Sequence, residues 1–572
     1  MKSLQPTIAP INSYALPRVI ETRKLKQPFY HHTVFFGVIL SSNFACCFFK
    51  CNNYRSNMGF VVGTISILIS SSVCLFLLLV LIKLFHKLWW TPFQIQRILN
   101  SQGIGGPGYR FIHGNTKEIR TMKAESIRKP MDLSHQVFQR LQPHIHSWIK
   151  IYGKNFLMWN GPKAQLVITD SEFAKEIIKN KEKAYIQMEL EGYLKKLLGN
   201  NSIVTAEGEK WSTLRKLANH ALHAESLKNM VPAMISSVEM MLERWKQCEG
   251  EEIEVYEEFI LLTSEVISRT AFGSSYLEGK NIFEMLTQLG IITVRNVFKI
   301  KLPVISQFWK SIDDIESEKL EEGIRDSILE IIKKRENAMA EVGNYGTDLL
   351  GLLVKASHDE DENKRITVET VIDECKTIYI AGHETTTTLL SWSVLLLAIH
   401  TDWQEEARKE VLELFGQQHP NAEGIPRMKK MSMIINESLR LYPPIMYITK
   451  KAQRKVKLGQ LTLPANINVT ILILALHFDP QIWGDDVCLF KPERFSEGIA
   501  KATNNNPGVY LPFGFGQRSC VGMNFAINET KIALSMILQR YAFSLSPTYS
   551  HSPVQLLAIR PQHGIQVKLH PL

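Results

Sequence analysis

A cysteine in a glycine-rich loop near the C-terminus is the residue of this chain best suited to hold a metal ion. The loop reads PFGFGQRSCVG over residues 512–522, and apolar, helix-forming residues follow from 523 to 541. A thiolate stays a stable ligand to iron only if it is shielded from water and receives hydrogen bonds. Gly516 and Gly522 would let the backbone pass close to a flat cofactor and aim N–H groups at the sulfur of Cys520. A helix beginning after the cysteine would favour the thiolate through its positive end. The alternative is a small buried apolar cysteine.

A second group of reactive side chains lies inside a long apolar segment. Residues 367–400 predict one helix, and its middle reads AGHETT over residues 381–386. An acid and hydroxyl groups are costly in a buried helix, and the Ala-Gly pair leaves room on one face. Such a place could bind dioxygen and water, with Glu384 and Thr385 as acid and alcohol. The alternative is a solvated polar turn.

Two further pairs combine acids and bases at helical spacing. Glu437 and Arg440 lie three residues apart and would share one helix face. Most such pairs are surface ion pairs that stabilise little. Trp211 and Arg215 lie one helical turn apart, and both can donate hydrogen bonds to carboxylates. The alternative for this second pair is a boundary tryptophan beside an exposed arginine.

Length and composition indicate one large body that positions these groups. The chain has 572 residues, of which 45% are hydrophobic and 21% charged. No repeat or long low-complexity tract divides it, and residues 109–572 predict one continuous, mostly helical catalytic domain. The eight cysteines show no paired framework, so we expect reduced thiols that face the cytosol.

The net charge of +10 does not predict nucleic-acid binding. Residues 1–57 hold seven Lys or Arg and one acid, so they carry +6 and leave +4 for the rest of the chain. This modest excess suits an anionic membrane surface or an acidic redox partner.

The N-terminal region predicts a membrane anchor. Residues 60–82 contain no charge, which is long enough for a helix that spans a bilayer, and Lys83 and Trp89-Trp90 follow as interfacial residues. A buried core helix would show a polar face, and a cleaved signal peptide would be shorter. We therefore expect an anchor at 58–85, followed by a juxtamembrane linker and hinge at 86–108. The glycine- and proline-rich end of this linker also suits an ordinary turn.

Residues 1–57 are basic, poor in acids and of doubtful status. They weakly suggest an organelle transit peptide. We expect instead that Met58 is the initiator and that 1–57 is an over-extended gene model. The cluster Cys46-Cys47 and Cys51 near His31-His32 could bind a metal ion, but the pattern is weak.

The fixed spacing in the cysteine loop resembles the haem-binding signature of the cytochrome P-450 family, the haem-thiolate monooxygenases. The other motifs follow in family order, and stretches such as 103–107 and 204–211 resemble the plant 72 clan. The resemblance implies haem b with Cys520 as the axial thiolate and Glu384 and Thr385 as the catalytic acid–alcohol pair. It implies cofactor contacts from Trp211, Arg215, Lys450, Phe513, Arg518 and Gly522, and a structural triad of Glu437, Arg440 and Arg494. Lys450 stands where relatives commonly have arginine, which reduces geometric control over a haem propionate.

The resemblance also implies a fold and an activity. We expect a mainly α cytochrome P-450 fold, with a large helical body and small peripheral β-sheets, behind the transmembrane anchor. The activity would be oxidation of a hydrophobic terpenoid, steroid or fatty-acid derivative in plant secondary metabolism. Electrons would come from an NADPH-dependent cytochrome P-450 reductase, for which Lys210, Lys216 and Arg518 are candidate contacts. The location would be the endoplasmic reticulum membrane, single-pass with a cytosolic catalytic domain; plastid targeting by 1–57 is the alternative.

Two other function classes remain open at this point. One is a family member that isomerises or dehydrates a peroxide; such members tend to lack the acid–alcohol pair that this chain keeps. The other is a non-catalytic haem-binding sensor or membrane scaffold. The substrate itself cannot be read from the apolar candidate pocket segments, which are 186–204, 378–381, 445–449 and 549–553.

Overall fold

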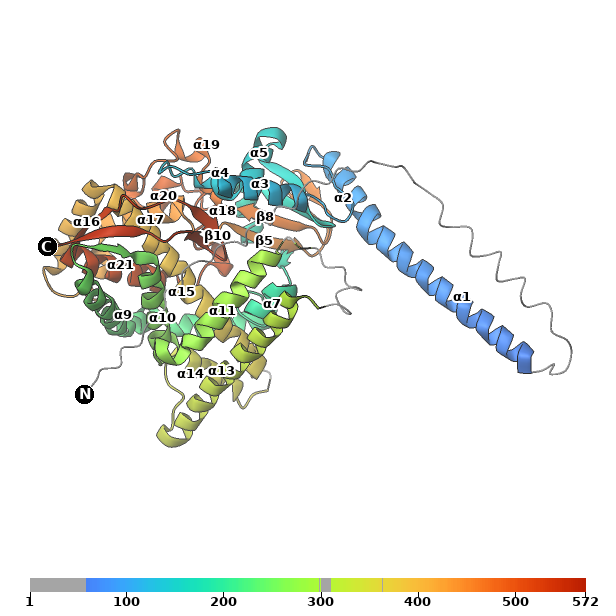
Figure 1. The fold of residues 1–572 in the computed structure, drawn as a ribbon, viewed down its shortest axis with the longest axis horizontal. Helices are drawn as coiled ribbons and strands as arrows, with labels where there is room; N and C mark the ends of the chain where they lie inside the picture. Colours follow the sequence, from blue (N-terminus) through green and yellow to red (C-terminus); the bar gives the residue numbers. More distant parts are fainter. Residues whose placement is uncertain (1–57, 298, 300–309, 363) are drawn as a thin grey trace, which may run out of the picture. The chain divides into compact units, whose positions relative to one another are not determined.

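The computed structural model describes residues 58–572, with gaps at 298, 300–309 and 363 (Figure 1). The transit-peptide, initiator and Cys46–Cys51 metal-site interpretations therefore lie outside the described residues. The first helix, α1 (Met58–Phe85), is apolar, and its side chains described from Ile65 onward are almost all exposed. It is long and apolar enough to cross a membrane, with a mean hydropathy of 2.8 in its span, and so could serve as an anchor.

Two helical segments occupy most of the expected linker. The π-helix η1 (His86–Trp90) and α2 (Thr91–Asn100) continue directly from α1. Of the glycines that follow, Gly105 and Gly106 lie against strand β1 (Asn155–Asn160): a Cβ at Gly106 would lie 1.9 Å from the carbonyl oxygen of Leu157, and the N–H of Leu157 donates to the carbonyl of Gly105 at 2.8 Å. This turn therefore needs glycine for its close approach to strand β1.

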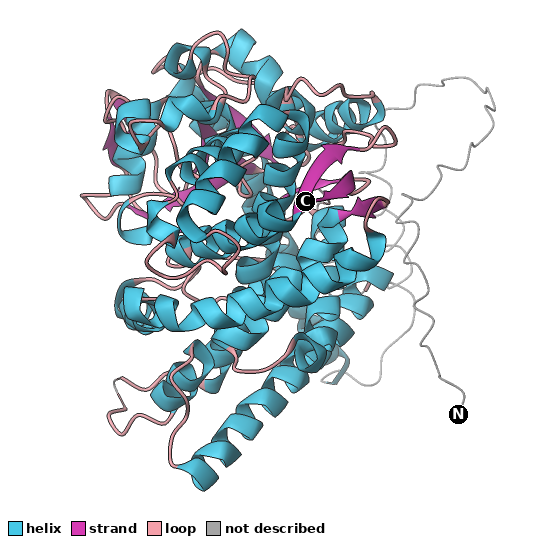
Figure 2. Ribbon diagram, turned by 90° about the vertical axis from the view of Figure 1, so that its left-hand side faces the viewer, coloured by secondary structure: helices cyan, strands magenta, loops and turns pink. Residues whose placement is uncertain are grey.

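Helices make up most of the body, as Figure 2 shows. After α2 the helices are α3 (Thr116–Arg128), α4 (Val137–Leu141), α5 (Pro143–Tyr152), α6 (Ser171–Lys179), α7 (Gly192–Leu198), α8 (Gly208–Ala221), α9 (Ala224–Trp245), η2 (Lys246–Cys248), α10 (Val255–Ala271), α11 (Tyr276–Asn296), α13 (Ile312–Val342), α14 (Leu349–Ser357), α15 (Val368–Ile399), α16 (Thr401–Phe415), η3 (Ile425–Arg427), α17 (Lys429–Leu441), α18 (Ile473–His477), α19 (Pro480–Trp483), η4 (Pro492–Phe495), α20 (Ile499–Ala502), η5 (Gly516–Arg518) and α21 (Met523–Arg540).

The strands form small sheets. They are β1 (Asn155–Asn160), β2 (Lys163–Ile168), β3 (Tyr185–Gln187), β4 (Glu252–Glu254), β5 (Tyr447–Ala452), β6 (Val456–Leu458), β7 (Leu461–Leu463), β8 (Asn468–Leu472), β9 (Tyr541–Leu545), β10 (Pro553–Gln555), β11 (Ile559–Pro561) and β12 (Gln566–Pro571). The largest sheet has the order β1-β2-β8-β5-β3, and the others pair β4-β12-β9, β10-β11 and β6-β7. The largest sheet packs against its own apolar cluster.

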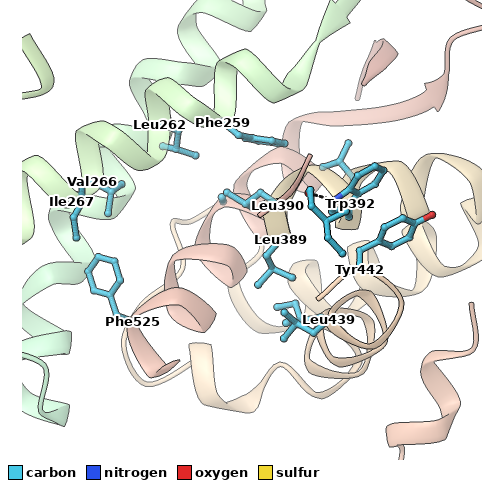
Figure 3. Packing of buried hydrophobic residues seen from close by; sticks show 14 of the residues in the cluster. Phe259, Leu262, Val266, Ile267, Leu389, Leu390, Trp392, Leu439, Tyr442 and Phe525 are labelled. Carbon is cyan, nitrogen blue, oxygen red and sulfur yellow. Dashed lines mark hydrogen bonds between the residues drawn. The ribbon is translucent and has the colours of Figure 1, made fainter. Parts of the chain in front are cut away.

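The long helix α15 is the centre of the main core. It begins after Thr367, whose hydroxyl caps it by accepting the N–H of Thr370, and it ends before His400, as the sequence predicts. Most of its side chains are buried, which is typical of a helix surrounded on all sides by other elements. Figure 3 shows this packing against α10, α17 and α21 through Phe259, Leu262, Val266, Ile267, Leu389, Leu390, Trp392, Leu439, Tyr442 and Phe525.

Candidate active site

The loop before α21 turns tightly and presents Cys520. Gly514 and Gly516 adopt φ values of +67° and +72°, a backbone conformation that favours glycine. The N–H of Cys520 donates to the carbonyl oxygen of Phe513 at 2.8 Å, which closes the turn. A Cβ on either glycine would meet no other atom closer than 3.8 Å, so this face of the loop is open. A flat group can therefore approach the backbone here.

The Cys520 thiol is accessible although protein surrounds it. Its side chain is exposed, yet burial raises the pKa of the thiol, while the N–H of Gly522 and the charge of Arg215 lower it. The exposure and the raised pKa agree if the sulfur is surrounded by protein on most sides and faces open space on one side. The helix α21 begins three residues later, as expected, and its N-terminal end points a positive dipole toward this loop.

Three cationic side chains gather beside this loop. Arg215 of α8 donates to the carbonyl oxygen of Ser519 at 2.5 Å, directly before Cys520. Arg518 lies with its guanidinium 4.4 Å from the ring centroid of Trp211 and pairs with Glu207 at 2.7 Å. The structure therefore brings Trp211, Arg215 and Arg518 together beside the cysteine loop.

The third cation is Lys450 of β5. Its Nζ donates to Oε1 of Gln187 at 2.8 Å. Burial and, to a smaller extent, the charge of Arg518 lower the pKa of Lys450 to about 8, while Glu207 opposes them. Lys450, Arg518 and Arg215 thus outnumber the one carboxylate named among their partners. This local excess of positive charge suits a dianionic ligand.

These residues fit haem b. The site combines one accessible thiol, an open glycine face and a group of cations with a deficit of negative charge. A haem offers iron for the thiolate, a flat ring for the glycine face and two propionates for the cations. Phe513 is half-buried and packs against the main core, and a Cβ on Gly522 would lie 3.9 Å from the Sγ of Cys520.

One stripe of α15 is accessible in the middle of the core. Ala381 is exposed, and Ile378 and Thr385, which lie three residues before and four after it, are partly exposed. The spacing places these side chains on one helix face. The hydroxyl of Thr385 donates to the carbonyl of Ala381 at 2.6 Å. The room beside Gly382, however, is used for packing, because a Cβ there would lie 2.6 Å from Cδ1 of Ile267 on α10.

Glu384 does not share that accessible stripe. It is buried and forms a two-pronged ion pair with Arg560 of β11, with Nε–Oε1 at 2.6 Å and Nη2–Oε2 at 2.5 Å. Burial alone would raise the pKa of Glu384, but the charge and hydrogen bonds of Arg560 hold it below its usual value. Sequence reasoning missed Arg560. An arginine inside the short apolar segment 558–561 is the signal that could have found it.

Glu437, Arg440 and Arg494 also come together. Arg440 donates to both carboxylate oxygens of Glu437 at 2.8 and 2.7 Å, and both side chains are fully buried. Nε of Arg494 lies 3.4 Å from the same carboxylate, and the N–H of Lys491 donates to it. The remaining N–H groups of Arg440 donate to the carbonyls of residues 477, 487 and 489. This cluster joins α17 to the segment before the cysteine loop.

Comparisons with known proteins agree with this geometry. The family model described as Cytochrome P450 matches residues 131–569. The chain is 62% identical over 506 residues to cytochrome P450 CYP749A22 of Panax ginseng, which covers 88% of this chain and 96% of that protein. It is 42% identical over 504 residues to the 11-oxo-beta-amyrin 30-oxidase of Glycyrrhiza uralensis, with 85% and 94% covered. It is 39% identical over 495 residues to cytochrome P450 CYP72A616 of Paris polyphylla, with 85% and 95% covered.

Proposed function

The chain belongs to the cytochrome P450 family, and we propose that it is a membrane-anchored haem-thiolate monooxygenase that oxidises a hydrophobic terpenoid, steroid or fatty-acid derivative. Its class, an oxidoreductase of the monooxygenase type, follows from the family. The observation that carries the finer proposal is the accessible Cys520 thiol beside the cations Arg215, Arg518 and Lys450. The terpenoid option is supported by the relative named for oxidation of 11-oxo-beta-amyrin.

Cys520 would hold the iron of haem b, and the cations would hold the propionates. When bound, haem supplies the reductive activation of dioxygen and the insertion of one oxygen atom into the substrate. Arg215 has a second role, because its bond to the carbonyl of Ser519 fixes the backbone next to the cysteine. The ring face of Trp211 contacts the guanidinium of Arg518 in a cation–π interaction and so helps to orient it.

Proton supply is the proposed task of Glu384 and Thr385. Thr385 presents its hydroxyl group on the accessible stripe of α15, where its oxygen can accept a proton and its hydrogen can be donated. Glu384 is held ionised by Arg560, so it can take up a proton when this ion pair opens. The buried position of Glu384 keeps bulk water from its ion pair with Arg560.

Electrons would reach the site from an NADPH-dependent reductase at the endoplasmic reticulum membrane. Lys210 and Lys216 are exposed on α8, the helix that carries Arg215, and so offer positive charge near the cysteine side. Helix α1 would anchor the chain with its catalytic domain in the cytosol. Reversing the charges of Lys210 and Lys216 should slow reductase-supported turnover, and unchanged turnover would contradict this contact.

The carbon monoxide difference spectrum of the reduced full-length chain tests the central proposal. We expect a red-shifted Soret band that is lost in Cys520→Ala, with Cys488→Ala as a matched control because Cys488 lies outside the cysteine loop. Folded protein supplied with haem that shows no such band would contradict thiolate ligation. A positive result would justify a substrate screen with reductase and NADPH, starting from pentacyclic triterpenes.

A further inference from the structure

The segment between α7 and α8, residues 199–207, connects the first part of α15 to Arg518; we call it the strap. At its α15 end, Oδ2 of Asp373 accepts the backbone N–H of Asn201 at 3.2 Å and its side-chain Nδ2 at 2.9 Å. Asp373 is buried, and Nζ of Lys376, one turn further along the helix, lies 3.6 Å from its other oxygen. The hydrogen bonds from Asn201 to the Asp373 carboxylate therefore hold the strap against α15.

Gly199 is fitted to the same carboxylate. Its φ of +69° is a conformation that other residues rarely adopt, and a Cβ there would lie 1.9 Å from Cγ of Asp373. The atoms nearest to such a Cβ all belong to the Asp373 carboxylate, which is buried and held by Asn201 and Lys376, so a side chain at this position must displace either the carboxylate or the strap.

Glu374 adds a second contact of a different kind. Its Oε1 accepts the N–H of Ile203, and its side chain is buried next to Asp373. Burial, supported by the negative charge of Asp373, raises the pKa of Glu374 to about 8, while the N–H of Ile203 and the charge of Lys210 lower it. Glu374 therefore acts as a mainly neutral acceptor at neutral pH.

The far end of the strap is bound by Arg518. Arg518 donates to the carbonyl of Ala206 at 2.8 Å and to that of Ile203 at 3.4 Å, and it pairs with Glu207 at 2.7 Å. All three partners belong to the strap. The guanidinium two residues before Cys520 is therefore oriented by this segment, which is itself fastened to Asp373.

We propose that Asp373 and Gly199 are positioning residues for the cysteine loop: they hold the strap against α15, and the strap holds Arg518 in place beside Cys520. This inference rests on the proposed haem-thiolate function, because Arg518 matters as a propionate donor. The strap directly follows α7, which lies within the candidate pocket segment 186–204. Movement of the strap would then shift the positive charge of Arg518 beside the cofactor.

Hydrogen exchange and the reduction potential of the haem-loaded full chain test the proposal together. The variants are Asp373→Asn, which removes the charge, and Gly199→Ala, which alters neither carboxyl group chemically. Glu374→Gln is the conservative variant, because it keeps a neutral acceptor. Glu369→Gln is the matched control on the same helix, where Glu369 is exposed and pairs with Arg325 at the surface.

We expect peptides covering 199–207 to exchange at least about tenfold faster in Asp373→Asn and Gly199→Ala, because hydrogen bonds to a charged group are lost or displaced. The reduction potential should shift in the same two variants, and the other two should match the wild type. Unchanged exchange, or faster exchange with an unchanged potential, would overturn the proposal. A wild type without the thiolate carbon monoxide band would instead refute the proposed function, and the exchange data would still report on the strap.

Discussion

The buried carboxylate of Glu384 forms a bidentate ion pair with Arg560, with hydrogen bonds of 2.6 and 2.5 Å, although the two residues lie 176 positions apart. Thr385, the next residue, lies instead on the accessible stripe of α15. The acid and the alcohol of the expected pair therefore lie in different surroundings. For Glu384 to pass a proton toward Thr385, its ion pair with Arg560 must open, so Arg560 should control the rate of proton supply.

Arg560→Gln should destabilise the protein by about 3–5 kcal/mol, because it leaves a buried carboxylate without its partner. Arg560→Lys should lose less, since the charge remains. The folded-state pKa of Glu384 is lowered, so the pair stabilises fully above the unfolded pKa of about 4.3 and is lost as pH falls through the folded value. The deficit of Arg560→Gln in thermal unfolding should therefore shrink at acidic pH. A deficit independent of pH would contradict this account.

Glu437→Gln should prevent most of the chain from accumulating in folded form. Arg440 would keep its charge in a fully buried position while the negative charge of its partner is removed, at a cost of about 3–5 kcal/mol. The yield of haem-loaded protein and its melting temperature measure the effect. Glu493→Gln, an exposed acid close to the same cluster, is the control and should behave like the wild type. Normal yield for Glu437→Gln would show that the cluster is not needed for folding.

Lys450→Met should speed the loss of haem to apomyoglobin by about tenfold or more, because one charge-assisted hydrogen bond to a propionate is removed. Lys450→Arg should retain haem at least as well as the wild type, since arginine keeps its charge when buried. Both variants keep the length of the side chain close to that of lysine. Equal rates for methionine and lysine would remove Lys450 from the set of cofactor contacts.

Acid should destabilise the body through a buried histidine pair. Nδ1 of His135 lies 2.7 Å from the Tyr442 hydroxyl, and Nε2 of His551 lies 3.4 Å from it. Burial, together with neighbouring positive groups, lowers the pKa of His135 to about 3 and that of His551 to about 4, and Asp132 opposes both shifts. The unfolded chain binds these protons below about pH 6.5, so stability should fall below that pH by about 1.4 kcal/mol per unit for each histidine.

Denaturant unfolding between pH 7 and 5 measures that slope. The double variant His135→Gln with His551→Gln should flatten it, whereas His419→Gln, which alters an exposed histidine, should not. A slope unchanged in the double variant would assign the acid sensitivity to other groups.

Several parts of the site could be predicted from the sequence because they depend on local spacing. The loop around Cys520 needs glycines at positions where φ is positive, and a helix begins soon after it, as its residue pattern indicates. The long helix over 367–400 follows from its continuous apolar content. Glu437 and Arg440 are neighbours on one helix turn, so their pairing needs only that the helix forms.

Local spacing could not show what fills the space around these elements. The sequence indicated free space beside Gly382 for a small ligand, but the side chain of Ile267 on α10 occupies that space. Nor could local spacing show that much of the linker at 86–108 is helical, or that Gly106 within it lies against Leu157 of β1.

By itself the sequence determined which chemical groups this protein has and which of them share a turn or loop, because hydrogen-bonding geometry over a few residues follows from residue type. Only the tertiary structure decided which charges meet. The contacts of Glu384 with Arg560, Asp373 with Asn201 and Arg518 with Ala206 join residues 172 to 312 positions apart. Such pairs form where packing brings separate elements together and excludes water. The residue pattern within one element therefore cannot predict them.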